Sequence, residues 1–532
     1  MAFEQVEESP RSLSSTALRF ILLATLLLLW GTSLAIYRLF FSPLSKFPGP
    51  KLAAVTGWVE TYHDVFRGGQ LIFKLGEWHE EYGPIVRINP WEVHIADPDF
   101  VQVLFASNSQ FDKKIEWKYR TGIPHSSFDT IEHQHHRMRR SAVAPFFSKQ
   151  KILGITDFIS QKAQRLCDRL ETEFAGSGRP AILNNCFTAM TFDVITHYAF
   201  ARSFEYMEDP NFEAPFTNAA KELATTLHTM GHFPWLLSLL QGLPQKWSVA
   251  MNPAMGAIFG FHGEIEDQIR AIKSGSNDAH KDVEHKTVFS ELLNSDLPTE
   301  EKAVERLKHE GKPTHLHTQN TTLTCPGGSI VAGGVETTST ALSKATFYVL
   351  ENPAIATRLR AELDSVFPDP RITPSLATLE ALPYLSAIVN ETLRITIGIS
   401  SRTARKSRKA PIIFKDIIIP AGADFSMTAY YTHTDPRIWD KPHEFVPERW
   451  LGKALAKNDE PLSKYLVAFS KGPRMCLGIN LARAELYIGM AVVFRRLELE
   501  LFETGRAAVE MKADYFIPFP DRATKGVRVL VK

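Results

Sequence analysis

Apolar positions near the N-terminus form one continuous run, and further along the chain they recur with helical or strand periods. Residues 20–37 contain no charge, and this length is close to the shortest that spans a bilayer as a helix. Residues 42–51 then contain three prolines and one glycine, a composition that predicts a stiff, non-helical spacer. We therefore expect a tail and membrane anchor over residues 1–41, a hinge over 42–51 and one large domain over 52–532.

The remaining periodicities predict a mainly α domain with small β-sheets. Apolar residues over 137–293 recur with the period of amphipathic helices, and shorter alternating runs indicate strands. The other predicted elements, in chain order, are paired strands at 84–89 and 92–96, strands at 412–419 and 424–431, a helix over 478–497 and a hairpin over 514–531. No Ser/Gly-rich or Pro-rich linker divides the chain, so one large domain is expected.

Charges around the apolar run predict its orientation. Acidic residues dominate before the run, and the bases Arg38, Lys46 and Lys51 follow it. Because positively charged flanks tend to stay in the cytosol, we expect a single-pass protein whose main domain faces the cytosol. A cleaved secretory signal is the alternative, but the run lacks a convincing small-residue cleavage site.

Composition narrows the classes of function. The formal net charge of +1 argues against a nucleic-acid partner. Four cysteines in 532 residues are too few for a disulfide scaffold and fit a reducing compartment. An apolar fraction of 44% is ample for a large core.

One cysteine lies in a segment built for a reactive thiolate. Cys476 is placed between Gly472 and Gly478, with Arg474 two residues before it and Phe469 at the start of the segment. Glycines permit a tight loop, and backbone N–H groups in such a loop can stabilise a thiolate. An arginine can neutralise a neighbouring anion, and a phenyl ring can exclude water. The alternative is a glycine-rich turn around a buried structural cysteine.

The segment resembles the haem loop of the cytochrome P450 family, Phe-x-x-Gly-x-Arg-x-Cys-x-Gly, at every fixed position. The resemblance extends from about residue 47 to the end of the chain. It implies the cytochrome P450 fold and haem b as the cofactor. It also implies that Cys476 is the axial ligand of the haem iron, that Arg474 contacts a haem propionate, and that Phe469 and Gly478 surround the sulfur.

Three charged residues match a second motif of the family. Glu391 and Arg394 lie three apart, a spacing that places them on one helix face. Alone, such a pair is most often surface decoration. By resemblance to the family's Glu-x-x-Arg element, Glu391 and Arg394 form a buried charge network with Arg449 that has a structural role.

A third motif combines flexible backbone with an acid and an alcohol. Adjacent glycines at Gly333 and Gly334 are costly inside a helix and indicate that a flat group lies close. Glu336 and Thr337 follow them and could relay protons. The alternative is an ordinary helix in which the threonine bonds back to a carbonyl. By resemblance, the segment is the family's oxygen-binding groove, with Glu336 and Thr337 as catalytic residues.

Basic residues upstream are expected to hold the propionates. The segment 133–140 contains three histidines, but their spacing does not place a tetrahedral set of metal ligands on one helix face. The family has Trp-x-x-x-Arg here, and this chain has His136 and Arg140 in those positions. The resemblance implies that both contact a propionate, as does Arg405, because guanidinium groups suit carboxylates. The expected substrate-pocket residues are Phe128, Val335, Ser400, Ser401, Thr403 and Ile517.

Residues 82–90 and 145–148 are most similar to filamentous-fungal members of secondary metabolism, of the trichodiene-oxygenase-like type. The resemblance implies a haem-thiolate monooxygenase of the endoplasmic reticulum that uses O2 and electrons from NADPH–cytochrome P450 reductase. Its substrate would be a lipophilic terpenoid, polyketide or alkaloid. Two alternatives remain: a family member that rearranges or dehydrates its substrate without O2, and a non-catalytic haem-binding membrane protein.

One segment does not fit the expected helix. Residues 311–326 contain two prolines and lack an apolar period, which predicts a break. Their removal would join Glu310 to Gly327 and place Leu307 and Ile330 seven apart on one helical stripe. The codons for these residues permit splice signals, and 48 nucleotides keep the reading frame. We therefore interpret 311–326 as an insertion or a retained intron, with a genuine surface loop as the alternative.

Overall fold

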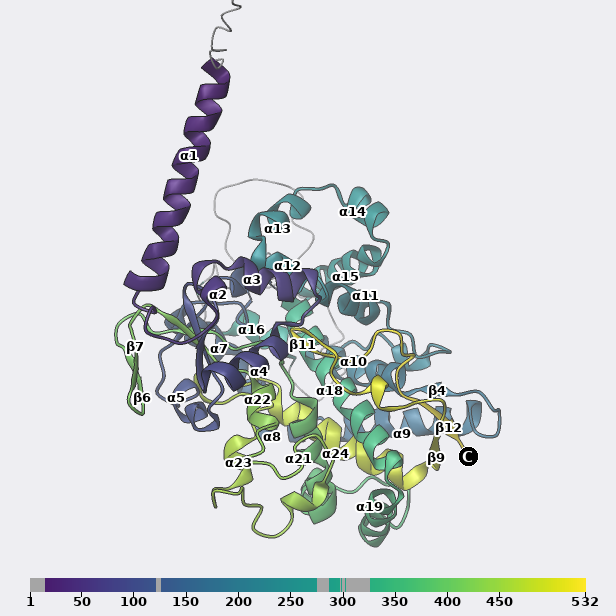
Figure 1. Ribbon diagram of the computed structural model, residues 1–532. Coiled ribbons are helices and arrows are strands. Elements are labelled where there is room, and N and C mark those ends of the chain that lie inside the picture. The colour runs from purple at the N-terminus through teal and green to yellow at the C-terminus, as the bar shows by residue number, and fades with distance from the viewer. Residues whose placement is uncertain (1–14, 121–125, 275–286, 297, 299–301, 303–325) are drawn as a thin grey trace, which may run out of the picture.

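The computed structural model describes residues 15–120, 126–274, 287–296, 298, 302 and 326–532. Its centre is a group of long helices packed around α18, Pro326–Glu351 (Figure 1). The helices that pack with it include α10 (Leu183–Phe200), α21 (Pro383–Thr396) and α24 (Ile479–Arg496), and α9 (Thr156–Glu173) packs in turn against α10 and α24. The residues 303–325, which hold most of the suspected insertion, lie outside the described residues.

Glycine allows α18 to approach α10 closely. A Cβ atom at Gly334 would lie 3.0 Å from the Ile195 side chain on α10, a tight contact that would require Ile195 to shift. At the neighbouring Gly333, no described atom outside the helix itself lies within 4 Å of such a Cβ. Gly334 is therefore a helix-packing position, whereas Gly333 borders open space.

The sheets are small, as the sequence predicts. The largest has the strand order β1-β2-β8-β5-β3, and β1 and β2 form the predicted antiparallel pair. Its strands are β1 (Ile85–Arg87), β2 (Glu92–Ile95), β3 (Asp112–Lys113), β5 (Arg405–Lys406) and β8 (Asp424–Ser426). β3 and β5 are antiparallel, with Lys113 directly opposite Arg405.

Three predicted elements differ from the structure. The run 412–419 is a hairpin of β6 (Ile412–Phe414) and β7 (Ile417–Ile419), not one strand. The run 424–431 ends as a strand at Ser426, and a short helix, α22 (Ala429–His433), follows.

The predicted C-terminal hairpin over 514–531 is also wrong in its pairing. β10 (Ala513–Tyr515) turns directly into β11 (Ile517–Phe519). The last strand, β12 (Arg528–Val531), instead pairs with β4 (Ala181–Ile182) and β9 (Leu499–Leu501). Both partners of β12 are segments that are distant from it in the chain. Periodicity indicates that a segment is a strand, but it does not indicate which strand pairs with it.

The N-terminal helix α1, Ser15–Ile36, stands clear of the other elements (Figure 1). A short π-helical segment, Tyr37–Phe41, continues it. Over Ser15–Phe41 the mean hydropathy reaches 2.1 and none of the side chains of that window is buried. The helix is therefore long and apolar enough to cross a membrane, and it starts earlier than the predicted 20–37.

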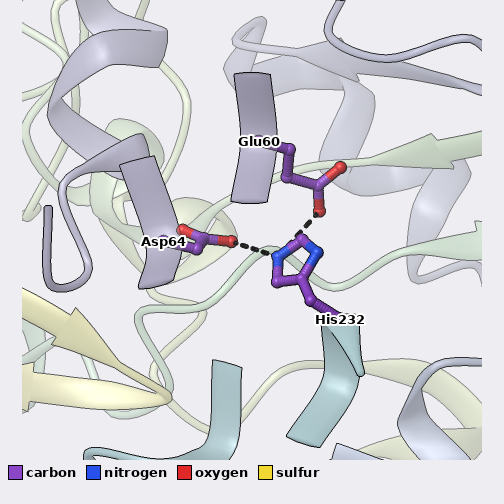
Figure 2. A group of neighbouring side chains, drawn as sticks. All are labelled: Glu60, Asp64 and His232. Atoms are coloured by element: carbon purple, nitrogen blue, oxygen red, sulfur yellow. Dashed lines mark hydrogen bonds and ion pairs between the residues drawn. The ribbon is translucent and has the colours of Figure 1, made fainter. Parts of the chain in front are cut away.

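A cluster of ion pairs joins the N-terminal part of the domain to α12, Leu227–His232. His232 lies 3.4 Å from the Asp64 carboxylate and 3.9 Å from that of Glu60 (Figure 2). Asp64 lies in the π-helical segment η2, Tyr62–Phe66. Arg402 pairs with both acids. These contacts fix α12 beside the cavity described next.

Candidate active site

A cavity of about 540 Å³ lies beside α18, and Cys476 lines it. Its wall is mostly apolar and is formed by α18, the cysteine loop, α7 (His133–Val143) and α11 (Pro215–Ala224), among other segments. Val335, Glu336 and Thr337 all line the same cavity. The structure therefore brings the predicted thiol and the predicted acid and alcohol to one cavity.

The cysteine loop requires glycine at its start. Gly472 has a φ of +70°, and a Cβ there would lie 2.5 Å from the Phe105 carbonyl oxygen. The Cys476 amide donates to the Phe469 carbonyl at 2.8 Å, which closes the loop. Burial raises the pKa of the Cys476 thiol, while the Gly478 N–H and the Arg140 charge lower it. The accessible surface of Cys476 faces the cavity, so the sulfur can bind a group placed there.

Five basic side chains line the cavity near this loop: Lys113, His136, Arg140, Arg405 and Arg474. Arg474 donates to the carbonyls of residues 130 and 131 at 2.8 and 2.7 Å. Burial and Arg474 lower the pKa of Arg405 to about 9. Burial, together with Arg474 and other cations, lowers the pKa of His136 to about 2. Burial and neighbouring cations therefore destabilise the protonated forms of Arg405 and His136.

This arrangement fits the two propionate groups of haem. Lys113 and Arg405 lie directly opposite each other on adjacent strands, and like charges in such pairs are destabilising. The buried Nε of Arg474 has no hydrogen-bond partner among the described residues. Burial, followed by Arg474 and Arg405, lowers the pKa of Lys113 far below its ordinary value. A ligand with two carboxylates would neutralise these cations and supply the acceptor that the Nε of Arg474 lacks.

The acid and the alcohol on α18 both have partners. The Thr337 hydroxyl donates to the Gly333 carbonyl at 2.9 Å. This is the backbone contact that a threonine makes in an ordinary helix. The Glu336 carboxylate accepts from the Thr340 hydroxyl at 3.2 Å and lies 3.2 Å from the Lys221 ammonium. Both residues nevertheless line the cavity, so the side chains reach the space in which a ligand would bind.

The predicted charge network is present. Arg394 makes two hydrogen bonds to Glu391, at 2.9 and 2.7 Å, and Arg449 makes one at 3.2 Å. Trp450 also donates its indole N–H to Glu391 at 2.9 Å. Glu391 and Arg394 are buried. The network joins α21 to the segment that contains residues 433–450 and precedes the cysteine loop.

The pocket residues are only partly placed as expected. The structure corrects Ser400 and Ser401: both are fully buried outside the cavity lining, and their hydroxyls donate to the Asp514 carboxylate at 2.8 and 3.0 Å. A buried carboxylate requires donors, and these serines supply them. The expected residues that do line the cavity are Phe128, Val335, Thr403 and Ile517, together with Phe469 and Gly478 of the loop.

Sequence reasoning missed three charged residues of the cavity wall: Lys113, Lys221 and Glu485. Burial raises the pKa of Glu485 well above its ordinary value, which indicates a neutral acid. Lys113 and Lys221 lie in segments without a family motif, so only their spatial placement shows them. Arg139, in the same basic segment 133–140, is buried and donates to the Thr130 hydroxyl at 2.9 Å.

Glu60, Asp64 and His232 could together ligate a metal ion (Figure 2). The two acids are already paired with Arg402, and Lys114 pairs with the neighbouring Glu92. Burial would raise the pKa of Glu60, but Arg402, Lys114 and His232 lower it to about 2. A divalent cation would have to compete with an arginine already in place, so we assign this cluster to an ion-pair network.

Comparison with known proteins finds relatives over most of the chain. The family described as Cytochrome P450 matches residues 48–517. The chain is 42% identical over 516 residues to the cytochrome P450 monooxygenase orf3 of Eupenicillium brefeldianum, covering 96% of this chain and 97% of the relative. It is 37% identical to the tryptophan 6-hydroxylase fscE of Fusarium equiseti, covering 94% of each chain.

A further relative is the N-acetyltryptophan 6-hydroxylase ivoC of Emericella nidulans, which is 37% identical over 96% of each chain. The family match and these relatives extend over nearly the whole sequence. The relatives are fungal monooxygenases, and the family consists of oxidoreductases that bind haem b. This chain belongs to the cytochrome P450 family.

Proposed function

We propose that the chain is a membrane-anchored haem-thiolate monooxygenase that inserts one oxygen atom from O2 into a C–H bond of a lipophilic secondary metabolite. One observation carries the proposal: the Cys476 thiol and the Glu336–Thr337 pair line the same mostly apolar cavity. A thiol alone would suit haem binding, and an acid and an alcohol in the same cavity also suit the delivery of protons.

Each part of the site then has a role. Cys476 holds the haem iron, and the ring of Lys113, His136, Arg140, Arg405 and Arg474 holds the propionates. Bound haem supplies the reductive activation of O2 and the transfer of one oxygen atom to a C–H bond. The second oxygen atom leaves as water, which consumes two electrons and two protons.

The chain's own residues handle the protons and the substrate. The Glu336 carboxylate takes protons from solvent, and the Thr337 hydroxyl holds the hydrogen bond that orients their delivery. The apolar wall, including Phe128, Val335 and Ile517, binds the substrate and excludes water. The two electrons arrive from NADPH–cytochrome P450 reductase.

Membrane attachment is part of the same proposal. The exposed, apolar α1 supports a single-pass anchor, and the bases after it support a cytosolic domain. We place the enzyme in the endoplasmic reticulum membrane, where its reductase would also reside. Protease protection of microsomes from an expressing strain tests the orientation: the domain should be digested without detergent.

Relatives that hydroxylate tryptophan and N-acetyltryptophan bring aromatic amino-acid derivatives into the set of candidate substrates, beside terpenoids, polyketides and alkaloids. The test of function is turnover of a metabolite panel by microsomes with NADPH and 18O2. One labelled oxygen atom per product is expected. Product formation without NADPH would instead support rearrangement or dehydration, and a chain that binds haem but gives no product would support the non-catalytic alternative.

A further inference from the structure

A single ion pair connects the substrate side of the cavity to the proton-relay acid. Lys221 lies on α11, and its Nζ is 3.2 Å from the Glu336 Oε2 on α18. Both side chains line the cavity, and both are partly exposed, at 29% and 19%. The Glu336 Oε2 is itself buried, so a ligand in the cavity reaches the ion pair from the more exposed Lys221.

Lys221 differs from the other cations of the cavity. The basic residues of the lining are Lys113, His136, Arg140, Lys221, His262, Arg405 and Arg474. Five of these are the basic side chains assigned above to the propionates. Lys221 comes from α11, and among the residues that the structure describes its ion-pair partner is Glu336.

The surroundings of Lys221 make its charge available for a ligand. Along α11, Phe216, Ala220, Leu223 and Ala224 also line the cavity, and they offer no second counter-ion. An ammonium in an apolar wall must be paired. Binding of haem and substrate would remove water from this space and strengthen that requirement.

We propose that Lys221 binds a carboxylate of the substrate and thereby releases Glu336 from the ion pair. The proposal rests on the monooxygenase function and specifies its substrate class: an apolar molecule that carries a carboxylate. The ammonium exchanges one carboxylate partner for another and stays paired, while the Glu336 carboxylate loses this counter-ion. No covalent bond changes in this step.

The exchange would couple substrate binding to proton supply. In the described state, one Glu336 oxygen accepts from Thr340 and the other faces Lys221. The Oε2 that faces Lys221 makes no hydrogen bond to a described residue and is held by the ion pair alone, while the Thr337 hydroxyl donates to the Gly333 carbonyl. A substrate carboxylate on Lys221 frees one Glu336 oxygen at the moment when a C–H bond is in place to be oxidised.

The test uses the haem-loaded full chain and matched ligand pairs: N-acetyltryptophan, 4-phenylbutyrate and dodecanoate, each against its methyl ester. Binding is followed by the shift of the haem Soret band and needs no turnover. For at least one pair we expect the acid to bind about tenfold more tightly than the ester, the size of one charge-assisted contact. If no acid is preferred in any pair, the proposal is wrong.

Variants separate this binding role from a structural one. Lys221→Met should abolish the preference for the acid, and Lys221→Arg should keep it. Glu336→Gln removes the competing carboxylate, so the acid should bind more tightly than to the wild type. His262→Gln, in the same cavity, is the control and should leave the preference unchanged.

An unchanged preference in Lys221→Met, or weaker acid binding in Glu336→Gln, would overturn the proposal. The carbon monoxide spectrum of each variant verifies that haem is bound and the fold retained. The titration is independent of the proposed function, because a chain that binds acids selectively but forms no oxygenated product would contradict only the monooxygenase assignment.

Discussion

The guanidinium of Arg394 donates two hydrogen bonds to the Glu391 carboxylate, at 2.9 and 2.7 Å, and both side chains are buried. The remaining N–H groups of Arg394 donate to the carbonyls of residues 433, 442 and 444. This one pair therefore holds a helix, α21, against the segment that leads to the cysteine loop.

Replacing Glu391 with Gln should destabilise the domain by about 3–5 kcal/mol, because two buried guanidinium groups lose their counter-charge. The thermal unfolding midpoint and the haem content per protein measure this effect. Glu77→Gln is the control: Glu77 pairs with Lys74 on the surface, so its loss should be nearly neutral. Equal midpoints for the two variants would contradict a structural role for the network.

Acid should weaken the connection between α12 and the N-terminal part of the domain. Burial raises the pKa of Glu60, but Arg402, Lys114 and His232 lower it from 4.5 to about 2; the pKa of Asp64 is also lowered. A carboxyl group whose pKa is lower in the folded state than in the unfolded state stabilises the fold at pH values above its unfolded pKa. This stabilisation is lost as the pH falls toward the folded pKa. The wild type should therefore lose stability from about pH 4.5 downward, toward pH 2.

The matched variant is Glu60→Gln. At pH 7 it should unfold more easily than the wild type, by up to about 3 kcal/mol from the pKa difference, and the gap should narrow as the pH falls below 4.5. Thermal midpoints between pH 3 and pH 7 measure the gap. A gap that is constant across this range would show that the Glu60 charge is not the source of the stability.

Much of this site could be predicted from sequence because it depends on local pattern. The loop around Cys476, the glycines of α18 and the spacing of Glu391 and Arg394 are each contained within about ten residues. Turn geometry and helix periodicity are local rules. The structure has a closed loop at Cys476, the glycines within α18 and a hydrogen-bonded pair of Glu391 and Arg394, as these local patterns predict.

The remainder depends on partners that are distant in the chain. Ser400 and Ser401 were expected in the pocket, but Asp514 accepts their hydroxyl groups instead. Lys113 enters the cationic ring only because β3 pairs with β5. Lys221 approaches Glu336 only because α11 packs over α18. Periodicity reports which face of an element is buried, and it does not report what covers that face.

Thr337→Ala should separate electron consumption from product formation. Without the Thr337 hydroxyl, the proton relay that includes Glu336 is interrupted. We expect hydrogen peroxide to be released in place of product, while haem is retained. NADPH consumed per product formed measures the loss. Thr337→Ser keeps the hydroxyl and should preserve coupling. If the alanine variant couples as well as the wild type, Thr337 is not the relay alcohol.

Residues 311–326 should be dispensable for the working enzyme. A chain in which Glu310 joins Gly327 should incorporate haem well, whereas the 532-residue chain should incorporate it poorly, because the insertion ends at Pro326, the first residue of α18. Haem content per protein compares the two chains. Sequencing of the mature transcript tests the origin of the segment: messages dominated by the codons for 311–326 would contradict a retained intron.

The central claim is that the Cys476 thiolate is the ligand of the haem iron. The reduced carbon monoxide spectrum of the wild type and of Cys476→Ser tests it most directly, because only a thiolate ligand gives the long-wavelength Soret band of this family. Cys167→Ser is the control, since Cys167 is a buried cysteine outside the cavity lining. We predict the thiolate band in the wild type and in Cys167→Ser, and its complete loss in Cys476→Ser. Retention of the thiolate band in Cys476→Ser would contradict the account.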